Sequence, residues 1–222
     1  MCYDAKSSLV AFLVTCVCSV YIYNRDYKYG KALALFFFTV SLMQFSEFFM
    51  WSDQGCGNMN HYATLFAFIV LCLEPLIAIW VTYKYDTTNI DRNKLKYILY
   101  IYIAVFGYAI IKALLYSGKL CTKPYPNNAH LNWGIDPIVK TLPKFILNIF
   151  YVLYFGAFLA FLLFKNKKEG LIYFLLYMGT LGIAKLITLG NPGTWKSMWC
   201  ISVNIIPILA IFIGEYYKSQ DN

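Results

Sequence analysis

Charge is scarce in this sequence, and its scarcity excludes most soluble folds. Asp, Glu, Lys and Arg make up only 14% of the 222 residues, whereas 60% are hydrophobic. Soluble domains average about 45–50% apolar residues, so a soluble fold of this length could not hide the excess. The composition therefore indicates a membrane protein.

The familiar signatures of catalysis are also missing. The chain has no Asn-x-Ser/Thr sequon, Walker motif, HExxH or GxSxG sequence, and no internal repeat is visible. Its seven cysteines include no CxxC pair, and there are only two histidines. These absences leave no standard hydrolase, nucleotide-binding or zinc-finger assignment.

Long apolar blocks are what the sequence does contain. A membrane-spanning helix needs about 20 apolar residues, and lipid allows only helices or closed barrels because every backbone polar group must be paired. The blocks are continuous rather than alternating, which favours helices. The sequence therefore predicts an all-α integral membrane bundle of about seven transmembrane helices, forming a single domain over 1–222, at about 7–23, 32–51, 61–83, 97–116, 145–164, 171–190 and 195–214.

Basic residues predict the orientation of the bundle. The predicted 1–2, 3–4 and 5–6 loops and the tail hold eleven Lys and Arg residues, against six on the opposite side. Because basic residues are retained in the cytoplasm, we expect the N-terminus outside and the C-terminus inside. The net charge of +8 is thus explained by loops facing a lipid bilayer, and no nucleic-acid partner is expected.

The segment 117–144 is the only long loop, and it holds four of the seven prolines. It could be a lid over an outward-facing pocket or a structured linker. Cys56 and Cys121 fall in outer loops, where we predict a disulfide, the alternative being free thiols. Cys16, Cys18 and Cys72 are interpreted as small buried residues.

Four ionisable residues lie inside predicted spans: Glu47, Glu74, Lys112 and Lys185. A charge at the centre of a span costs roughly 2.5–3.5 kcal/mol on insertion scales, so each one is a site hypothesis. Their charges sum to zero, which would allow the bundle to pair them.

Glu47 is the strongest candidate among these four. At 100° per residue it shares one helical face with Ser41, Gln44 and Trp51, and such a polar stripe should face other helices. Counting from Trp51 places it roughly 6 Å below the outer interface. We therefore predict that Glu47 is the central functional residue, ionised in an outward-opening cavity.

Lys112 and Lys185 are the proposed partners of that carboxylate. Both are estimated at the same depth as Glu47, counting inward from the outer ends of their segments. The alternative is that each lysine extends to the outer headgroups.

Glu74 lies deeper, past the midplane, and is followed by Pro75. A carboxyl group beside a helix kink can bind an ion, carry a proton or hydrogen-bond a neighbouring helix in its protonated form. Asn204 in the last segment is a candidate partner.

Several outer-side residues could also carry chemistry. A mixed metal site with a carboxylate could use ligands from Cys2, Cys56, Cys121, Cys200, His61 and His130, although their spacing resembles no known ligand motif.

Short motifs spread along the chain resemble an uncharacterised family of multi-pass bacterial membrane proteins. Family members begin Met-Cys-Phe-Ser-Ala and carry Gln-Gln-x-x-Glu-Gly-x-x-Trp, Glu-Pro and a late Ser-x-Trp-Cys. The corresponding residues here are Met1-Cys2-Tyr3-Asp4-Ala5, Gln44-x-x-Glu47 with Trp51, Leu73-Glu74-Pro75, His130 and Ser197-x-Trp199-Cys200.

The resemblance nominates residues without naming a reaction. It implies functional roles for Cys2, Glu47, Glu74, His130, Trp199 and Cys200. The chain departs from the family pattern at Tyr3, Asp4, Phe45 and Phe48, the last of which replaces a glycine and would alter helix packing beside Glu47.

Two classes of function remain open. The first is a sensor, transporter or ion- or proton-handling protein with an outward-opening polar pocket for a small molecule or ion. The alternative is a membrane-embedded enzyme that uses Cys2, His130 and Glu47 at the outer surface, with or without a metal. A retinal protein is disfavoured because the last segment has no lysine near its middle.

Overall fold

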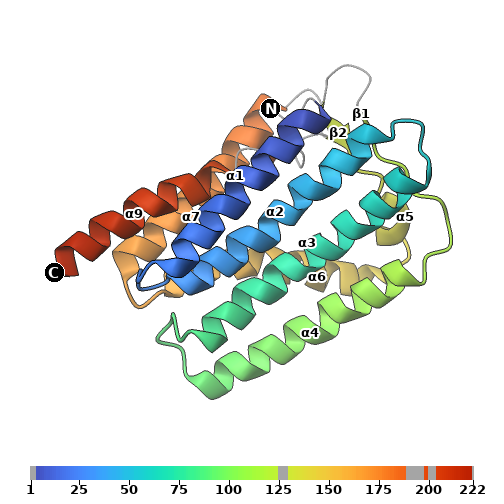
Figure 1. Cartoon of the computed structure of the whole chain (residues 1–222). Coiled ribbons are helices and arrows are strands. Elements are labelled where there is room, and N and C mark those ends of the chain that lie inside the picture. Colours follow the sequence, from blue (N-terminus) through green and yellow to red (C-terminus); the bar gives the residue numbers. More distant parts are fainter. Residues whose placement is uncertain (1–3, 125–129, 189–197, 200–203, 222) are drawn as a thin grey trace.

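A computed structural model describes residues 4–124, 130–188, 198–199 and 204–221 of the chain (Figure 1). Helices dominate it, as predicted, and one short antiparallel pair, β1 with β2, lies between α4 and α5. The elements are α1 Ala5–Asn24, α2 Gly30–Ser52, α3 Asn58–Lys84, α4 Arg92–Leu114, β1 Lys123–Pro124, β2 Leu131–Asn132, α5 Asp136–Val139, α6 Lys144–Phe158, the 3-10 helix η1 Leu159–Leu163, α7 Lys167–Ile187 and α9 Ile205–Asp221.

Six helical stretches in the described part of the chain are long and apolar enough to cross a membrane. They are α1, α2, α3, α4, the continuous stretch Lys144–Leu163, and α7. The chain is thus an all-α apolar bundle of the kind expected for a multi-pass membrane protein. The seventh predicted span, 195–214, falls partly outside the described residues, so the count of seven stays a prediction.

The helices connect at two ends of the bundle. At one end, contacts tie the α1–α2, α3–α4 and η1–α7 turns to one another and to α9: Lys165 N donates to Thr87 O (2.9 Å), Asn166 N donates to Tyr29 Oη (2.7 Å), and Arg25 forms an ion pair with Glu215. The start of α1, the α2–α3 turn and the segment between α4 and α6 lie at the other end (Figure 1). We call this second end the disulfide end, after the Cys56–Cys121 bond described below. The predicted 1–2, 3–4 and 5–6 loops and the C-terminal helix do lie together, whereas the predicted 6–7 loop falls mostly outside the described residues.

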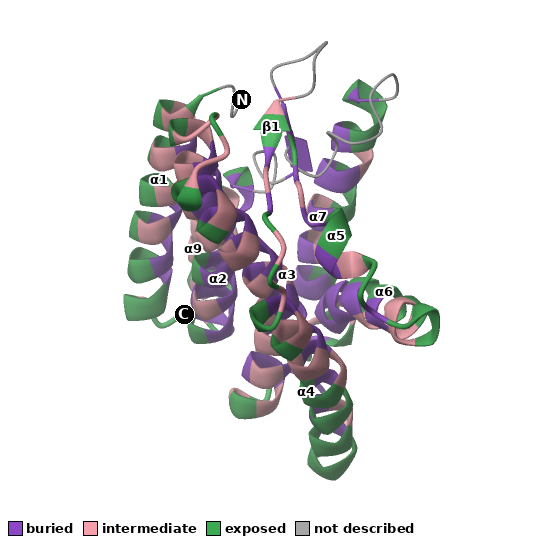
Figure 2. Cartoon of the chain, turned by 90° about the vertical axis from the view of Figure 1, so that its right-hand side faces the viewer, coloured by how far each residue is buried: buried purple, intermediate pink, exposed green. Residues whose placement is uncertain are grey.

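Burial distinguishes the central helices from the peripheral ones. In the most apolar stretches of α2 and α3, 61% and 56% of residues are buried, against 28% in α1 and α4. The exposed side chains of the peripheral helices are apolar, as at Val17 on α1 and Ile103 on α4. Figure 2 shows the exposed residues on the outer faces of these helices. Lipid would cover such faces.

The helices α6 and α7 separate toward the disulfide end. The helix α6 packs on α3 and α4, whereas its continuation, η1, packs on α7. Residues between α4 and α6 fill part of the space that results, and this arrangement creates the cavity described next.

Candidate functional site

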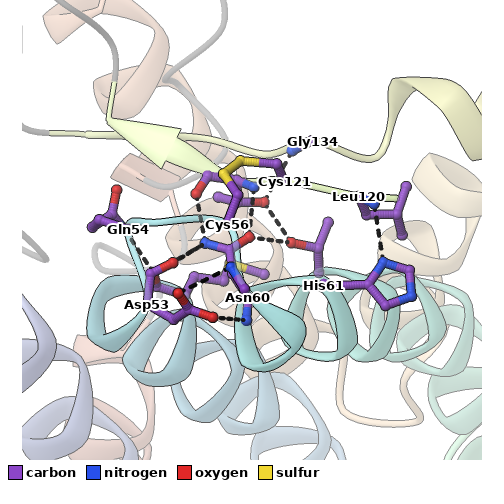
Figure 3. Close-up of a disulfide and its surroundings, with 12 residues drawn as sticks. Asp53, Gln54, Cys56, Asn60, His61, Leu120, Cys121 and Gly134 are labelled. Atoms are coloured by element: carbon purple, nitrogen blue, oxygen red, sulfur yellow. Dashed lines mark hydrogen bonds between the residues drawn. A yellow bond between two sulfur atoms is a disulfide. The ribbon is translucent and has the colours of Figure 1, made fainter. Parts of the chain in front are cut away.

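The disulfide end is held by a network around the first turns of α3. A disulfide joins Cys56 to Cys121 with their Cα atoms 5.3 Å apart, which confirms the predicted pairing (Figure 3). It closes a loop across 65 positions of sequence and fixes the long segment after α4 onto the α2–α3 turn.

Asn60 is the centre of this network. Its amide nitrogen donates to the backbone oxygens of Met50 (3.2 Å), Asp53 (3.0 Å) and Thr122 (2.8 Å). Its amide oxygen accepts from the backbone N–H of Thr122 at 2.8 Å. Met50 O and Asp53 O also accept from other donors, whereas both backbone groups of buried Thr122 are paired by Asn60, whose bonds replace water there.

Two further side chains complete the anchor. The carboxylate of Asp53 accepts from the backbone N–H groups of Asn60 (3.1 Å) and Gly57 (3.0 Å), and these bonds lower the pKa of Asp53. His61 Nδ1 accepts from the backbone N–H of Leu120 at 3.0 Å (Figure 3). The predicted outer-side candidate His61 therefore has a structural bond to the long loop.

Gly134 allows the returning strand to pass close to the disulfide. A Cβ atom on this residue would lie 2.0 Å from the backbone oxygen of Cys121, so only glycine fits. Its N–H donates to Thr122 Oγ1 at 3.0 Å. The preceding residue, Trp133, is thereby directed into the bundle.

Trp133 meets the first predicted carboxylate. Its indole Nε1 donates to Glu47 Oε1 at 3.0 Å, and Glu47 has no exposed surface. Ser41 and Gln44 are equally buried, which confirms that the polar stripe of α2 faces the interior.

A cavity of about 310 Å³ lies beside Trp133, between α3, α6 and α7. Residues of the segment between α4 and α6 cover it, and nine of its eighteen lining residues are aromatic. They are Val40, Phe68, Leu71, Glu74, Trp133, Ile135, Asp136, Val139, Leu142, Leu147, Phe150, Tyr151, Tyr154, Phe155, Phe158, Tyr177, Lys185 and Trp199. Glu47 is not among them, so the cavity is built around the second predicted carboxylate, Glu74, and its walls are mainly apolar rather than polar.

Glu74 is the buried acid of the cavity. The hydroxyl of Tyr154 donates to its Oε2 at 2.6 Å, and the residue is only 5% exposed. Its Oε1 makes no hydrogen bond within the described part of the chain. Tyr177, also a lining residue, has a buried hydroxyl that lacks a hydrogen-bond partner among those same residues. Within the described residues, Glu74 therefore brings one unpaired carboxyl oxygen to the cavity, whereas the Tyr177 hydroxyl is enclosed by protein.

The cavity reaches the surface between α6 and α7. Tyr151 and Phe155 line it from α6 and are 48% and 39% exposed. Lys185 from α7 and Asp136 from α5 are also exposed lining residues. A molecule entering here would meet these two charged side chains before it reached Glu74.

Two predicted pairings are wrong. Lys112 does not pair with Glu47: its amino group lies 5.7 Å from the ring centroid of Tyr108 on its own helix, because α4 packs on α3 and α6. Asn204 does not pair with Glu74: its side-chain oxygen accepts from Thr15 Oγ1 at 2.9 Å, because α9 packs on α1. The pairing of Glu47 with Lys185 stays a prediction.

The remaining candidates fall in different places. Trp199 lines the cavity and its Nε1 donates to Thr180 Oγ1 at 3.2 Å. His130 is buried in the loop, and burial lowers its pKa. Cys2 and Cys200 lie outside the described residues. Among the residues that are described, no group of three or more His, Cys, Asp or Glu side chains could hold a metal ion.

Sequence reasoning missed the aromatic partners of the site. Trp133, Tyr154 and Tyr177 were not singled out, because an aromatic residue in an apolar block or a loop is ordinarily a packing residue. The one available signal was that a buried carboxyl group needs a hydrogen-bond donor, which a tyrosine or tryptophan can supply.

Comparison with known proteins gives one full-length similarity. No family model and no solved structure matches the chain. An uncharacterised protein of Acanthamoeba polyphaga mimivirus is 22% identical over an alignment of 248 residues, which covers 99% of this chain and 100% of the viral protein. The similarity extends over the whole bundle, but this relative is itself uncharacterised and suggests no activity.

Proposed function

We propose that this chain is an integral membrane protein with seven crossings whose cavity opens toward the outside and binds a small molecule. Through that cavity it acts as a sensor or transporter. The observation that carries the proposal is the cavity itself: a space of about 310 Å³ with a buried carboxyl group, Glu74, whose Oε1 is unpaired among the described residues. Ligand sites are typically concave and apolar with a few convergent polar groups.

Two elements of the family resemblance support this assignment. Glu74 belongs to the Glu-Pro pair and Trp199 to the Ser-x-Trp-Cys motif, and they are 125 positions apart in the sequence. Both line the cavity. A shared ligand site would explain why residues from both motifs lie around one cavity.

The alternative, an enzyme using Cys2, His130 and Glu47, has less support. The carboxylate of Glu47 accepts a bond from Trp133 and has no exposed surface, whereas a catalytic acid or base must reach its substrate. Proton handling by Glu74 remains compatible with the cavity, since a buried carboxyl group can carry a proton.

The proposed topology rests on the grouping of loops at two ends. The end with the Arg25–Glu215 ion pair holds the more basic loops, so it is assigned to the cytoplasm. The C-terminal helix packs on α1 from Thr15, near the middle of α1, to that ion pair, which is the cytoplasmic half of the proposed seventh crossing.

Cysteine labelling tests the orientation. Lys168→Cys places a thiol at the proposed cytoplasmic end and Lys119→Cys places one in the outer loop, both at exposed positions. Both variants are made in a background in which Cys2 and Cys200 are replaced with Ser, because these two residues are predicted on the outer side. In intact cells a membrane-impermeant maleimide should then label only the Lys119→Cys protein. Ready labelling of Lys168→Cys would overturn the orientation.

Saturable binding of a neutral apolar probe tests the cavity. Neopentylbenzene should bind the purified protein saturably and change the fluorescence emission of Trp133 and Trp199, which line the cavity. Leu71→Trp should abolish this binding because the larger ring fills the space. Leu13→Trp, on an exposed face of α1, serves as the control and should bind like the parent protein. Equal binding to both variants would show that the probe enters the detergent rather than the cavity.

A further inference from the structure

Resting on the proposed cavity, we infer that its ligand is an organic cation, an ammonium group attached to an apolar body. Three features of the lining lead to this class: its charge, its aromatic walls and the unpaired carboxyl oxygen of Glu74.

The ionisable lining residues leave one negative charge unbalanced when all are ionised. Glu74 and Asp136 contribute two carboxylates, and Lys185 contributes one ammonium group, so the sum is −1. A monovalent cation would balance the lining. An anionic ligand would instead face two carboxylates, which is unfavourable in a space shielded from water.

The walls suit the same class of ligand. The nine aromatic lining residues include Phe150, Phe158 and Trp199, and the rings of Phe158 and Trp199 lie 5.5 Å apart, edge to face. Aromatic faces attract ammonium groups through their quadrupoles, and rings arranged around a space are the usual means of binding alkylated amines. Leu71, Val139 and their apolar neighbours would contact the rest of the ligand.

The unpaired carboxyl oxygen of Glu74 complements an N–H group. Its Oε1 can accept a hydrogen bond. Tyr154 already donates to Oε2, which fixes the carboxyl group in the cavity wall. A protonated amine would supply a donor to Oε1.

The entrance has matching chemistry. Asp136 is exposed at the opening and would attract a cation, while the exposed rings of Tyr151 and Phe155 offer it an apolar surface. The ligand would pass between α6 and α7 before its charged group reached Glu74.

Two probes of the same shape distinguish the effect of a positive charge on binding from the effect of filling the cavity. Benzyltrimethylammonium and neopentylbenzene differ by one atom, a positively charged nitrogen in place of carbon, and neither has an N–H. The parent protein should bind the ammonium at least about tenfold more tightly, within the range of cation–aromatic and ion-pair interactions away from water. Binding would be measured in the same micelles, with the Leu71→Trp protein as the baseline.

Glu74→Gln should reduce the advantage of the ammonium to about twofold or less, because the counter-charge is gone. Its affinity for neopentylbenzene should be unchanged, which would show that the cavity is intact. Asp26→Asn, which removes one negative charge at the opposite end of the bundle, should retain the full advantage.

Equal affinity of the parent protein for the two probes would overturn the cation inference and leave the cavity standing. An advantage that survives Glu74→Gln would overturn the assignment of Glu74 as the counter-charge of the cation. If neither probe binds the parent protein above the Leu71→Trp baseline, the proposed function fails, and the cation inference fails with it.

Discussion

Two buried carboxyl groups, Glu47 on α2 and Glu74 on α3, have different surroundings. Glu47 has no exposed surface, and Trp133 donates to its Oε1. Glu74 is nearly as buried, yet it lines a cavity and has one oxygen without a partner in the described structure. The first lies beside an anchored loop, and the second lies where α6 and α7 separate.

The difference teaches that the cost of burying a charge does not by itself identify a ligand site. A carboxyl group in a spanning helix must be stabilised, but a neighbouring side chain can do this as well as a ligand can. Open space next to the group distinguishes the two cases. Trp133 links the regions, because its indole nitrogen bonds Glu47 while the residue also lines the cavity.

The largest loss of stability should come from Asn60→Leu, at the centre of the network that anchors the loop beside Glu47. The substitution removes the side-chain partners of both backbone groups of Thr122, which is itself buried. Each buried polar group left unpaired costs about 1–3 kcal/mol, so we expect a loss of about 3–5 kcal/mol in the free energy of unfolding. Denaturant unfolding in detergent would measure it.

The control for this substitution is Asn24→Leu. Asn24 also bonds a backbone oxygen, that of Val20 at 2.9 Å, but at an exposed position. Its replacement should cost less than about 0.5 kcal/mol, as is usual at exposed positions. Similar losses for Asn60 and Asn24 would mean that the network does not anchor the loop.

Removing the disulfide should have the next largest effect. Replacing Cys56 and Cys121 with Ser frees a loop that spans 65 positions, and loss of a cross-link of this kind typically costs about 2–4 kcal/mol. The parent protein should lose comparable stability on full reduction, whereas the double variant should be insensitive to reductant. A parent protein whose melting temperature is unchanged by reductant would contradict the structural role of the bond.

The sequence was sufficient for the features that depend on one helix or one loop. Block length predicted seven spans, six of which correspond to helices long and apolar enough to cross a membrane. The 100° spacing predicted that Ser41, Gln44 and Glu47 face inward, and loop position predicted the disulfide. Each of these follows from local geometry or from the side of the membrane on which a loop lies.

Features that depend on how helices pack could not be obtained in the same way. Equal depth suggested that Lys112 approaches Glu47, but depth says nothing of position around the bundle, and α4 packs elsewhere. The bond between Tyr154 and Glu74 joins residues 80 positions apart, and no spacing rule predicts it. The cavity depends on the separation of α6 from α7, which is a property of the assembled bundle.

Trp133→Phe should cause the smallest of the three predicted losses of stability. It tests most directly the link that Trp133 makes between the Glu47 region and the cavity. The change removes an indole donor from a carboxyl group with no exposed surface, which should cost about 1–3 kcal/mol.

The matched control is Trp199→Phe, because Trp199 also lines the cavity but donates to Thr180, a neutral hydroxyl that forms a second hydrogen bond to Tyr177 O. That substitution should cost about 0.5–1.5 kcal/mol, since neutral hydrogen bonds contribute less than those to charged groups. Both changes enlarge the cavity by a similar volume, so their difference isolates the bond to Glu47. Thermal unfolding of the two variants in the same detergent would measure it. If Trp133→Phe costs no more than Trp199→Phe, the Glu47 region does not depend on the tryptophan, and the contrast between a sealed and an open carboxyl group loses its physical basis.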